Sequence, residues 1–113
     1  LEQARDAARA LVSRGARAVL LKGGHIEGAP VDVLATPDGL VEIAGERVDT
    51  QHTHGTGCTY SAAITAELAR GLSLEEAIRA SKEWLTRALR SAPGIGGGIG
   101  PLDHFVPTRA PRP

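Results

Sequence analysis

The sequence predicts an α/β fold, and specifically part of an α/β sandwich in which helices cover a sheet. Three observations predict this class. Residues 1–14 carry apolar side chains at helical spacing and lead into a continuous apolar run at 18–21. Residues 31–50 alternate apolar and polar side chains, and helical spacing returns at 57–70 and beyond. This order of patterns is typical of helices that pack on a sheet.

The first helix is predicted from a stripe of apolar residues that ends before Gly15, the expected stop signal: Leu1, Ala4, Ala8, Leu11 and Val12. The run from Ala18 to Leu21 has no polar residue, which favours a strand buried on both faces, as in a parallel sheet. A single strand cannot form a sheet. We therefore expect it to pair with sheet from a missing N-terminal half, or with a second copy in a homo-oligomer.

Residues 31–50 predict short antiparallel strands joined by turns. Apolar and polar residues alternate around Pro37-Asp38-Gly39 and again around Gly45. Both glycines follow or accompany residue types that favour tight turns. The sequence therefore predicts a small antiparallel unit between the first strand and the later helices.

Two further helices are predicted after residue 56. The first, at 57–70, is built from small residues around Ile64 and Leu68. The second opens at Ser73 and Glu76, which have capping-box spacing, and ends before Pro93. Its expected buried stripe consists of Ala77, Ile78, Ser81, Trp84, Leu85, Ala88 and Leu89.

Length and composition limit the domain organisation. The chain has 113 residues, contains no methionine and opens directly in a helical pattern. We interpret it as a fragment in which residues 1–105 form the C-terminal portion of one domain and 106–113 form a flexible tail. N-terminal processing is the alternative reading of the missing methionine.

Charge and cysteine content exclude several classes of partner. Thirteen basic and thirteen acidic residues give no net charge and no basic stripe, so nucleic acid is not an expected partner. No apolar run approaches the roughly 18 residues that a membrane span needs, and no signal peptide is visible. One cysteine cannot form an internal disulfide, which fits a cytoplasmic protein.

The segment THGTGCTYS, residues 53–61, contains that cysteine and a glycine turn before a predicted helix. Gly55 and Gly57 allow main-chain N–H groups to face one space at the helix N-terminus, where negative charge is favoured. Thr56 lies between them, and Cys58 lies in the same field, which favours its thiolate. The segment lacks the lysine of a P-loop, and Tyr60 stands where a dinucleotide fingerprint needs glycine.

Three interpretations of this turn remain open from the residues alone. Cys58 could remove a proton from an alcohol during phosphoryl transfer while the amides stabilise the moving phosphoryl group. It could instead act as the nucleophile of an acyltransferase or hydrolase. The third interpretation is an ordinary helix start with a buried, inert cysteine.

Lys22 favours the phosphoryl-transfer interpretation. It follows the apolar run directly, at a strand end where ligands of open α/β sheets bind. Gly23 and Gly24 come next and are expected to let a ligand approach the main chain closely. A lysine is a mobile positive charge suited to a phosphate chain, although a solvated lysine beyond a strand end is the plainer alternative.

Four segments resemble one known family. They are VLLKGGH, VDTQHTHGTGCTYSAAITAELARG, EAIRASKEWL and GGGIGPLDHF. Together they are similar to the C-terminal half of the hydroxymethylpyrimidine/phosphomethylpyrimidine kinases of thiamine biosynthesis, members of the ribokinase-like superfamily. The resemblance runs to Phe105, and it implies the C-terminal part of a three-layer α/β/α sandwich with a small antiparallel strand unit.

The resemblance also implies the chemistry. It implies a kinase that uses ATP and Mg²⁺ to phosphorylate 4-amino-5-hydroxymethyl-2-methylpyrimidine and then its monophosphate. By position, Cys58 matches the proposed catalytic base, and Gly55, Thr56 and Gly57 match the anion hole. Lys22 matches a phosphate-contacting lysine, and Lys82 matches a lysine near the nucleotide.

The resemblance places the pyrimidine-binding residues and much of the magnesium site in the absent N-terminal half. The present residues therefore do not separate a pyrimidine kinase from a pyridoxine or pyridoxal kinase of the same superfamily. A non-catalytic fragment is a further alternative. His52 and His54 have spacing that suits a metal pair, but without a third ligand we expect loop roles and no metal site. His104 is expected to pack or cap near the last loop.

Overall fold

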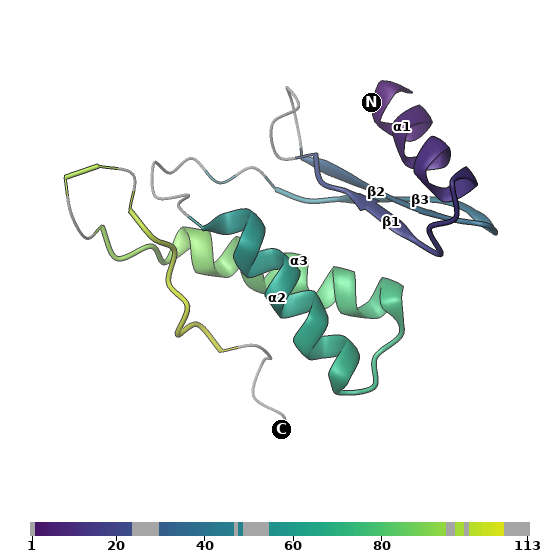
Figure 1. The fold of residues 1–113 in the computed structure, drawn as a ribbon. Helices are drawn as coiled ribbons and strands as arrows, with labels where there is room; N and C mark the ends of the chain where they lie inside the picture. The colour runs from purple at the N-terminus through teal and green to yellow at the C-terminus, as the bar shows by residue number, and fades with distance from the viewer. Residues whose placement is uncertain are drawn as a thin grey trace. The chain divides into compact units, whose positions relative to one another are not determined.

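The structure is a computed structural model, and it describes residues 2–23, 30–46, 48, 55–94, 97, 98 and 100–107. The chain divides into two compact units, Leu1–Arg47 and Val48–Pro113. The first contains a helix and a sheet, and the second contains two helices followed by an extended segment (Figure 1).

The first unit is a three-stranded antiparallel sheet with one helix. The helix α1 (Glu2–Ser13) is followed by β1 (Val19–Leu21), β2 (Val31–Thr36) and β3 (Gly39–Ala44). The strand order is β1-β2-β3, so each strand pairs with its neighbour in the sequence (Figure 1). This topology is reached with short connections and needs no crossover.

The hairpin between β2 and β3 confirms the antiparallel prediction for residues 31–44. Thr36 pairs with Gly39 at the turn, and the Thr36 hydroxyl accepts a hydrogen bond of 3.2 Å from the Asp38 amide. Gly39 has a φ of +141°, a conformation that favours glycine. The second turn is predicted around Gly45, and β3 ends directly before it, at Ala44. Residues 47 and 49–54, which follow, lie outside the described residues.

The pairing of β1 differs from the prediction of a parallel strand buried on both faces. Within the described residues its partner is β2, which runs antiparallel, and all three side chains of β1 are half-buried. The connection between the two strands consists of residues 22–30 alone. A parallel pairing needs a crossover of about a dozen residues or more, so this short connection favours the antiparallel return.

The core of the first unit lies between α1 and one face of the sheet. Alternate residues of β2 contribute to this face. Ala8 of α1 and Val33 and Ala35 of β2 are at most 1% exposed. Small residues on the helix allow its backbone to approach the sheet closely. The partly buried residues packed around this cluster are Ala4, Val12, Val19, Leu21 and Leu40.

Arg5 forms an ion pair between α1 and β3. Its guanidinium donates to the carboxylate of Glu42 on β3 and to that of Glu2 in its own helix. The hydrogen bond from Arg5 to Glu42, and after it the one to Glu2, raises the pKa of Arg5 further above its ordinary value. The pair is solvent-exposed, so it adds orientation to the apolar packing rather than much stability.

The second unit is an antiparallel helix pair. The helix α2 (Thr56–Ala69) and the helix α3 (Leu74–Arg90) pack along each other (Figure 1). The turn between them uses Gly71 at a φ of +96°, and the Leu72 amide donates to the Glu67 carbonyl. Both helices lie where the sequence predicted them.

The start and the buried face of α3 confirm the sequence prediction. The Ser73 hydroxyl accepts a hydrogen bond of 3.3 Å from the Glu76 amide, the capping contact that the spacing predicted. The helix ends at Arg90, before Pro93. The predicted stripe is buried except for Leu89, which is half-buried: Ala77, Ile78, Ser81, Trp84, Leu85 and Ala88.

The segment 100–107 is bound to α3 by hydrogen bonds. The Asp103 amide donates to the Ala88 carbonyl at 3.0 Å. The Trp84 indole nitrogen donates to the Val106 carbonyl at 2.8 Å, and Arg87 donates to the Pro107 carbonyl at 2.7 Å. The first two residues of the predicted tail are thus held by α3, and residues 108–113 lie outside the described residues.

A membrane span requires a helix that is both long and apolar. Among the helices of the described residues, none is long and apolar enough to cross a bilayer.

The cap of α3 gives the first testable prediction. We expect Ser73→Ala to lower the free energy of unfolding by about 1 kcal/mol, because the Glu76 amide loses its acceptor. Urea denaturation measures the change. Ser73→Thr should retain most of the stability, and Ser91→Ala, an exposed serine at the other end of α3, should change it by less than about 0.5 kcal/mol. Equal stability of Ser73→Ala and the native chain would contradict the capping role.

Candidate active site

The candidate site is built on the start of α2. Gly55 occupies the cap position with a φ of +78° and a ψ of 7°, and no side chain caps this end. The Thr59 amide donates to the Gly55 carbonyl at 2.9 Å, which closes the first turn. An L-residue with a side chain is strained in this left-handed conformation, so glycine sets the point at which the helix begins.

Three predicted site residues share the first turn of α2 after Gly55. They are Thr56, Gly57 and Cys58, and Gly57 has an ordinary helical φ. Cys58 is exposed and is the only cysteine of the sequence. Its thiol is therefore open to a small molecule, at the helix end where main-chain amides and the helix dipole favour negative charge. The thiol is thus not buried among the described residues, and a catalytic role for it stays a prediction.

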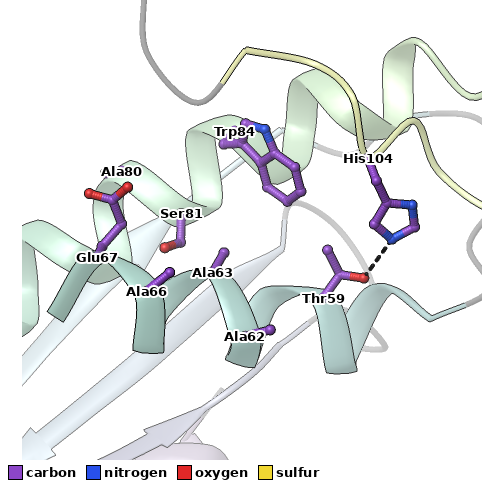
Figure 2. A pocket seen from close by; sticks show the side chains of 9 residues that line it. All are labelled: Thr59, Ala62, Ala63, Ala66, Glu67, Ala80, Ser81, Trp84 and His104. Atoms are coloured by element: carbon purple, nitrogen blue, oxygen red, sulfur yellow. Dashed lines mark hydrogen bonds between the residues drawn. The ribbon is translucent and has the colours of Figure 1, made fainter. Parts of the chain in front are cut away.

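A side-chain hydrogen bond joins this turn to the segment 100–107. The Thr59 hydroxyl and the His104 Nε2 atom are 3.1 Å apart, and Figure 2 shows the two side chains facing each other. Either tautomer of the imidazole permits the bond, because a hydroxyl can donate or accept. Thr59 follows Cys58 directly in the sequence, so the bond acts next to the thiol.

A pocket of about 320 Å³ lies between α2 and α3 beside this bond. Figure 2 shows Trp84 and Ser81 of α3 near the alanines of α2 that line it. The Ser81 hydroxyl is buried and has no hydrogen-bond partner among the described residues. The lining residues are Thr59, Ala62, Ala63, Ala66, Glu67, Ala80, Ser81, Trp84 and His104.

The two predicted lysines belong to different units. Lys22 is exposed and directly follows β1 in the first unit. Lys82 is half-buried in the middle of α3, in the same unit as Cys58. Gly55, Thr56, Gly57 and Cys58 are thus brought into one turn. A role of either lysine toward phosphate remains a proposal.

The structure explains why position 23 is glycine, and the sequence interpretation missed this explanation. A Cβ atom at this position would lie 1.9 Å from the Val31 carbonyl oxygen, so the glycine admits the chain's own strand β2 rather than requiring a ligand. Its amide donates to the buried Asp32 carboxylate at 2.9 Å. The signal for this contact was an acidic residue within the apolar run of β2. Gly24 lies outside the described residues.

Metal binding by side chains requires several ligating groups close together. Among the described residues, no group of three or more His, Cys, Asp or Glu side chains is placed to hold a metal ion. His52 and His54, the pair considered from the sequence, lie outside those residues.

Known proteins resemble this chain over nearly its whole length. A family model described as phosphomethylpyrimidine kinase matches residues 1–103. The chain belongs to the phosphomethylpyrimidine kinase family. A relative from Streptomyces coelicolor, hydroxymethylpyrimidine/phosphomethylpyrimidine kinase, is 47% identical over 102 residues, which are 88% of this chain and 37% of the relative. The family resemblance deduced from the sequence motifs is therefore confirmed.

Solved structures of kinases share the fold of this family member. An ADP complex of Bacillus subtilis pyridoxal kinase matches with a TM-score of 0.86 and 37% identity, over 94% of this chain and 40% of that one. Pyridoxal kinase from Staphylococcus aureus in complex with AMP-PCP matches with a TM-score of 0.87 and 29% identity, over the same shares. The predicted ribokinase-like α/β class is confirmed. This chain spans about two fifths of these relatives.

The close approach of Gly23 to β2 gives a second prediction. We expect Gly23→Ala to lower the free energy of unfolding by about 1–3 kcal/mol, because the added methyl group overlaps the Val31 carbonyl. Chemical denaturation of the purified protein provides the measurement. Gly97→Ala is the matched control, since a Cβ there meets no atom within 4 Å. A Gly23→Ala variant as stable as this control would show that the packing explanation is wrong.

Proposed function

We propose that this chain carries the phosphoryl-transfer part of a kinase that phosphorylates 4-amino-5-hydroxymethyl-2-methylpyrimidine and then its monophosphate. The observation that carries the proposal is the exposed Cys58 thiol in the first turn of a helix that starts at Gly55. Membership of the phosphomethylpyrimidine kinase family supports the substrate class. The ADP and AMP-PCP complexes of the structural neighbours support ATP as the donor.

The proposed step is proton removal coupled to phosphoryl transfer. The Cys58 thiolate takes the proton of the substrate hydroxymethyl group, and the alcohol oxygen forms a bond to the γ-phosphorus of ATP while the bond to ADP breaks. The main-chain amides from Gly55 to Gly57 lie at the positive end of α2 and stabilise the charge on the transferring group. No covalent bond to sulfur forms in this step.

Lysine side chains provide the remaining positive charge in the proposal. Lys22 contacts the phosphate chain of ATP, and Lys82 on α3 lies near the nucleotide. An ammonium group on a flexible stem suits phosphate oxygens, whose charge it neutralises as a point charge. Gly24 stays a candidate for close approach of the phosphates, whereas the described packing explains Gly23 without a ligand.

Mg²⁺ is part of the proposal through ATP. Bound together with ATP, it would supply positive charge that offsets the negative charge developing during transfer. In the part of the chain that the structure describes, no group of three or more His, Cys, Asp or Glu side chains is placed to hold a metal ion. We therefore assign none of the described side chains as a metal ligand.

Pyridoxal kinase activity is the second candidate. It is favoured by the 37% identity to the Bacillus subtilis pyridoxal kinase over nearly the whole chain. Both candidate substrates are heteroaromatic rings with a hydroxymethyl group, so one phosphoryl-transfer turn serves either. The choice between them depends on contacts to the ring, which none of the described residues is assigned to make.

The chain is proposed to work together with further polypeptide of the kinase fold. It spans 37% of the Streptomyces coelicolor relative. The helix α2 carries Glu67 as its one charged residue, yet many of its apolar and small side chains are exposed, Leu68 among them at 42%. A helix with a single charged residue and exposed apolar side chains is typical of a more buried position, which supports such association. A second copy is the alternative partner.

The kinase assay gives the third prediction. Full-length enzyme containing this sequence should phosphorylate the hydroxymethylpyrimidine faster than pyridoxal, and Cys58→Ala should lower turnover by about 10²–10⁴ if a general base is lost. The affinity for ATP should remain, because the main-chain amides are unchanged. Steady-state kinetics with both alcohols and titration calorimetry with ATP measure these effects.

Thr65→Val is the control, since its hydroxyl bonds within α2 to the Ser61 carbonyl, away from the first turn. Unchanged turnover of Cys58→Ala would remove the proposed base. Faster phosphorylation of pyridoxal would select the second candidate. A thioester on Cys58, detected by mass spectrometry during turnover, would indicate the acyltransferase chemistry instead.

A further inference from the structure

The first turn of α2 has weak support of its own. It begins without a side-chain cap, and glycine occupies its second position. A cap hydrogen bond contributes about 1 kcal/mol, and glycine within a helix costs about 1 kcal/mol relative to alanine. A contact from outside α2 is therefore significant for where Cys58 is held.

His104 provides such a contact on a well-anchored segment. The residue before it, Asp103, bonds to α3 through its amide and accepts from the Phe105 amide through its carboxylate at 2.9 Å. Beyond Phe105, the carbonyl groups of Val106 and Pro107 accept from Trp84 and Arg87 of α3. The main chain is thus fixed on both sides of His104.

Thr59, which closes the first turn of α2, makes this contact with His104. Its amide bonds to the Gly55 carbonyl at 2.9 Å, and its hydroxyl bonds to His104 at 3.1 Å. The two bonds join the start of the helix, through one residue, to a segment held by α3. Cys58 lies between the two bonded positions in the sequence and moves with that turn.

We propose that His104 is a positioning residue for Cys58: through Thr59 it holds the first turn of α2 against α3. The functional meaning rests on the proposed role of Cys58 in phosphoryl transfer. The contact itself does not, because it joins two side chains of this chain, those of Thr59 and His104. His104 touches no reacting atom in this proposal, and its effect is carried by the Thr59 hydroxyl.

The test measures the rate at which iodoacetamide alkylates Cys58 in the 113-residue protein, by mass spectrometry and without ligand. Thiolate is the reacting form of a cysteine, so the alkylation rate reports the surroundings that the first turn of α2 gives this sulfur. We expect Thr59→Val and His104→Ala each to slow alkylation about two- to five-fold, the range that a helix-end charge interaction gives. The double variant should be no slower than either single variant, because one bond is removed in all three.

Conservative variants separate positioning from general loss of structure. Thr59→Ser keeps the hydroxyl, and His104→Gln places an amide nitrogen near the Nε2 position. Both variants should therefore keep the native alkylation rate. Thr65→Val and Phe105→Ala are controls, the first in the same helix and the second beside His104 with a side chain that is 95% exposed. Both should leave the rate unchanged, and thermal unfolding of every variant identifies those that fail to fold.

Native alkylation rates in Thr59→Val and His104→Ala would overturn the proposal, as would effects that multiply in the double variant. The proposal would also be overturned if both conservative variants stayed folded and still lost the native alkylation rate. Unchanged kinase turnover of Cys58→Ala would instead overturn the proposed function. It would leave the alkylation result intact, so the two failures are distinguishable.

Discussion

The left-handed conformation of Gly55 is the constraint on which the candidate site depends. Its φ of +78° lets the chain turn directly into α2, so that Thr56 is the first helical residue and Cys58 stays in the first turn. For a residue with a side chain this conformation costs roughly 1–2 kcal/mol, which would favour a different helix start. The position of the thiol relative to the helix end therefore depends on one main-chain dihedral angle.

Local signals in the sequence predicted much of the fold. The Ser73 cap, the buried stripe of α3 and the hairpin around Asp38 are each determined by residues a few positions apart, which is why patterns reveal them. The glycine turn before Cys58 is equally local. Its assignment to a kinase family needed the resemblance in addition, because the turn alone was also compatible with acyl transfer.

Contacts between distant residues were beyond the patterns. Thr59 and His104 are 45 positions apart, and no periodicity relates them. The direction of β1 relative to its neighbour depends on its pairing with β2, whereas its apolar run alone indicated a parallel strand. The role of Gly23 was also beyond the patterns. A glycine that leaves room for a ligand and one that leaves room for the Val31 carbonyl look alike in sequence.

Amide chemical shifts measured during an ATP titration test the central claim most directly. The proposed function places the phosphates of ATP at the helix end that begins at Gly55. In ¹⁵N-labelled protein with Mg²⁺ present, we predict the largest shift changes at residues 55–59. Changes confined to other residues, with the amides of 55–59 unmoved at saturating ATP, would contradict the claim that the start of α2 is the phosphate-binding turn.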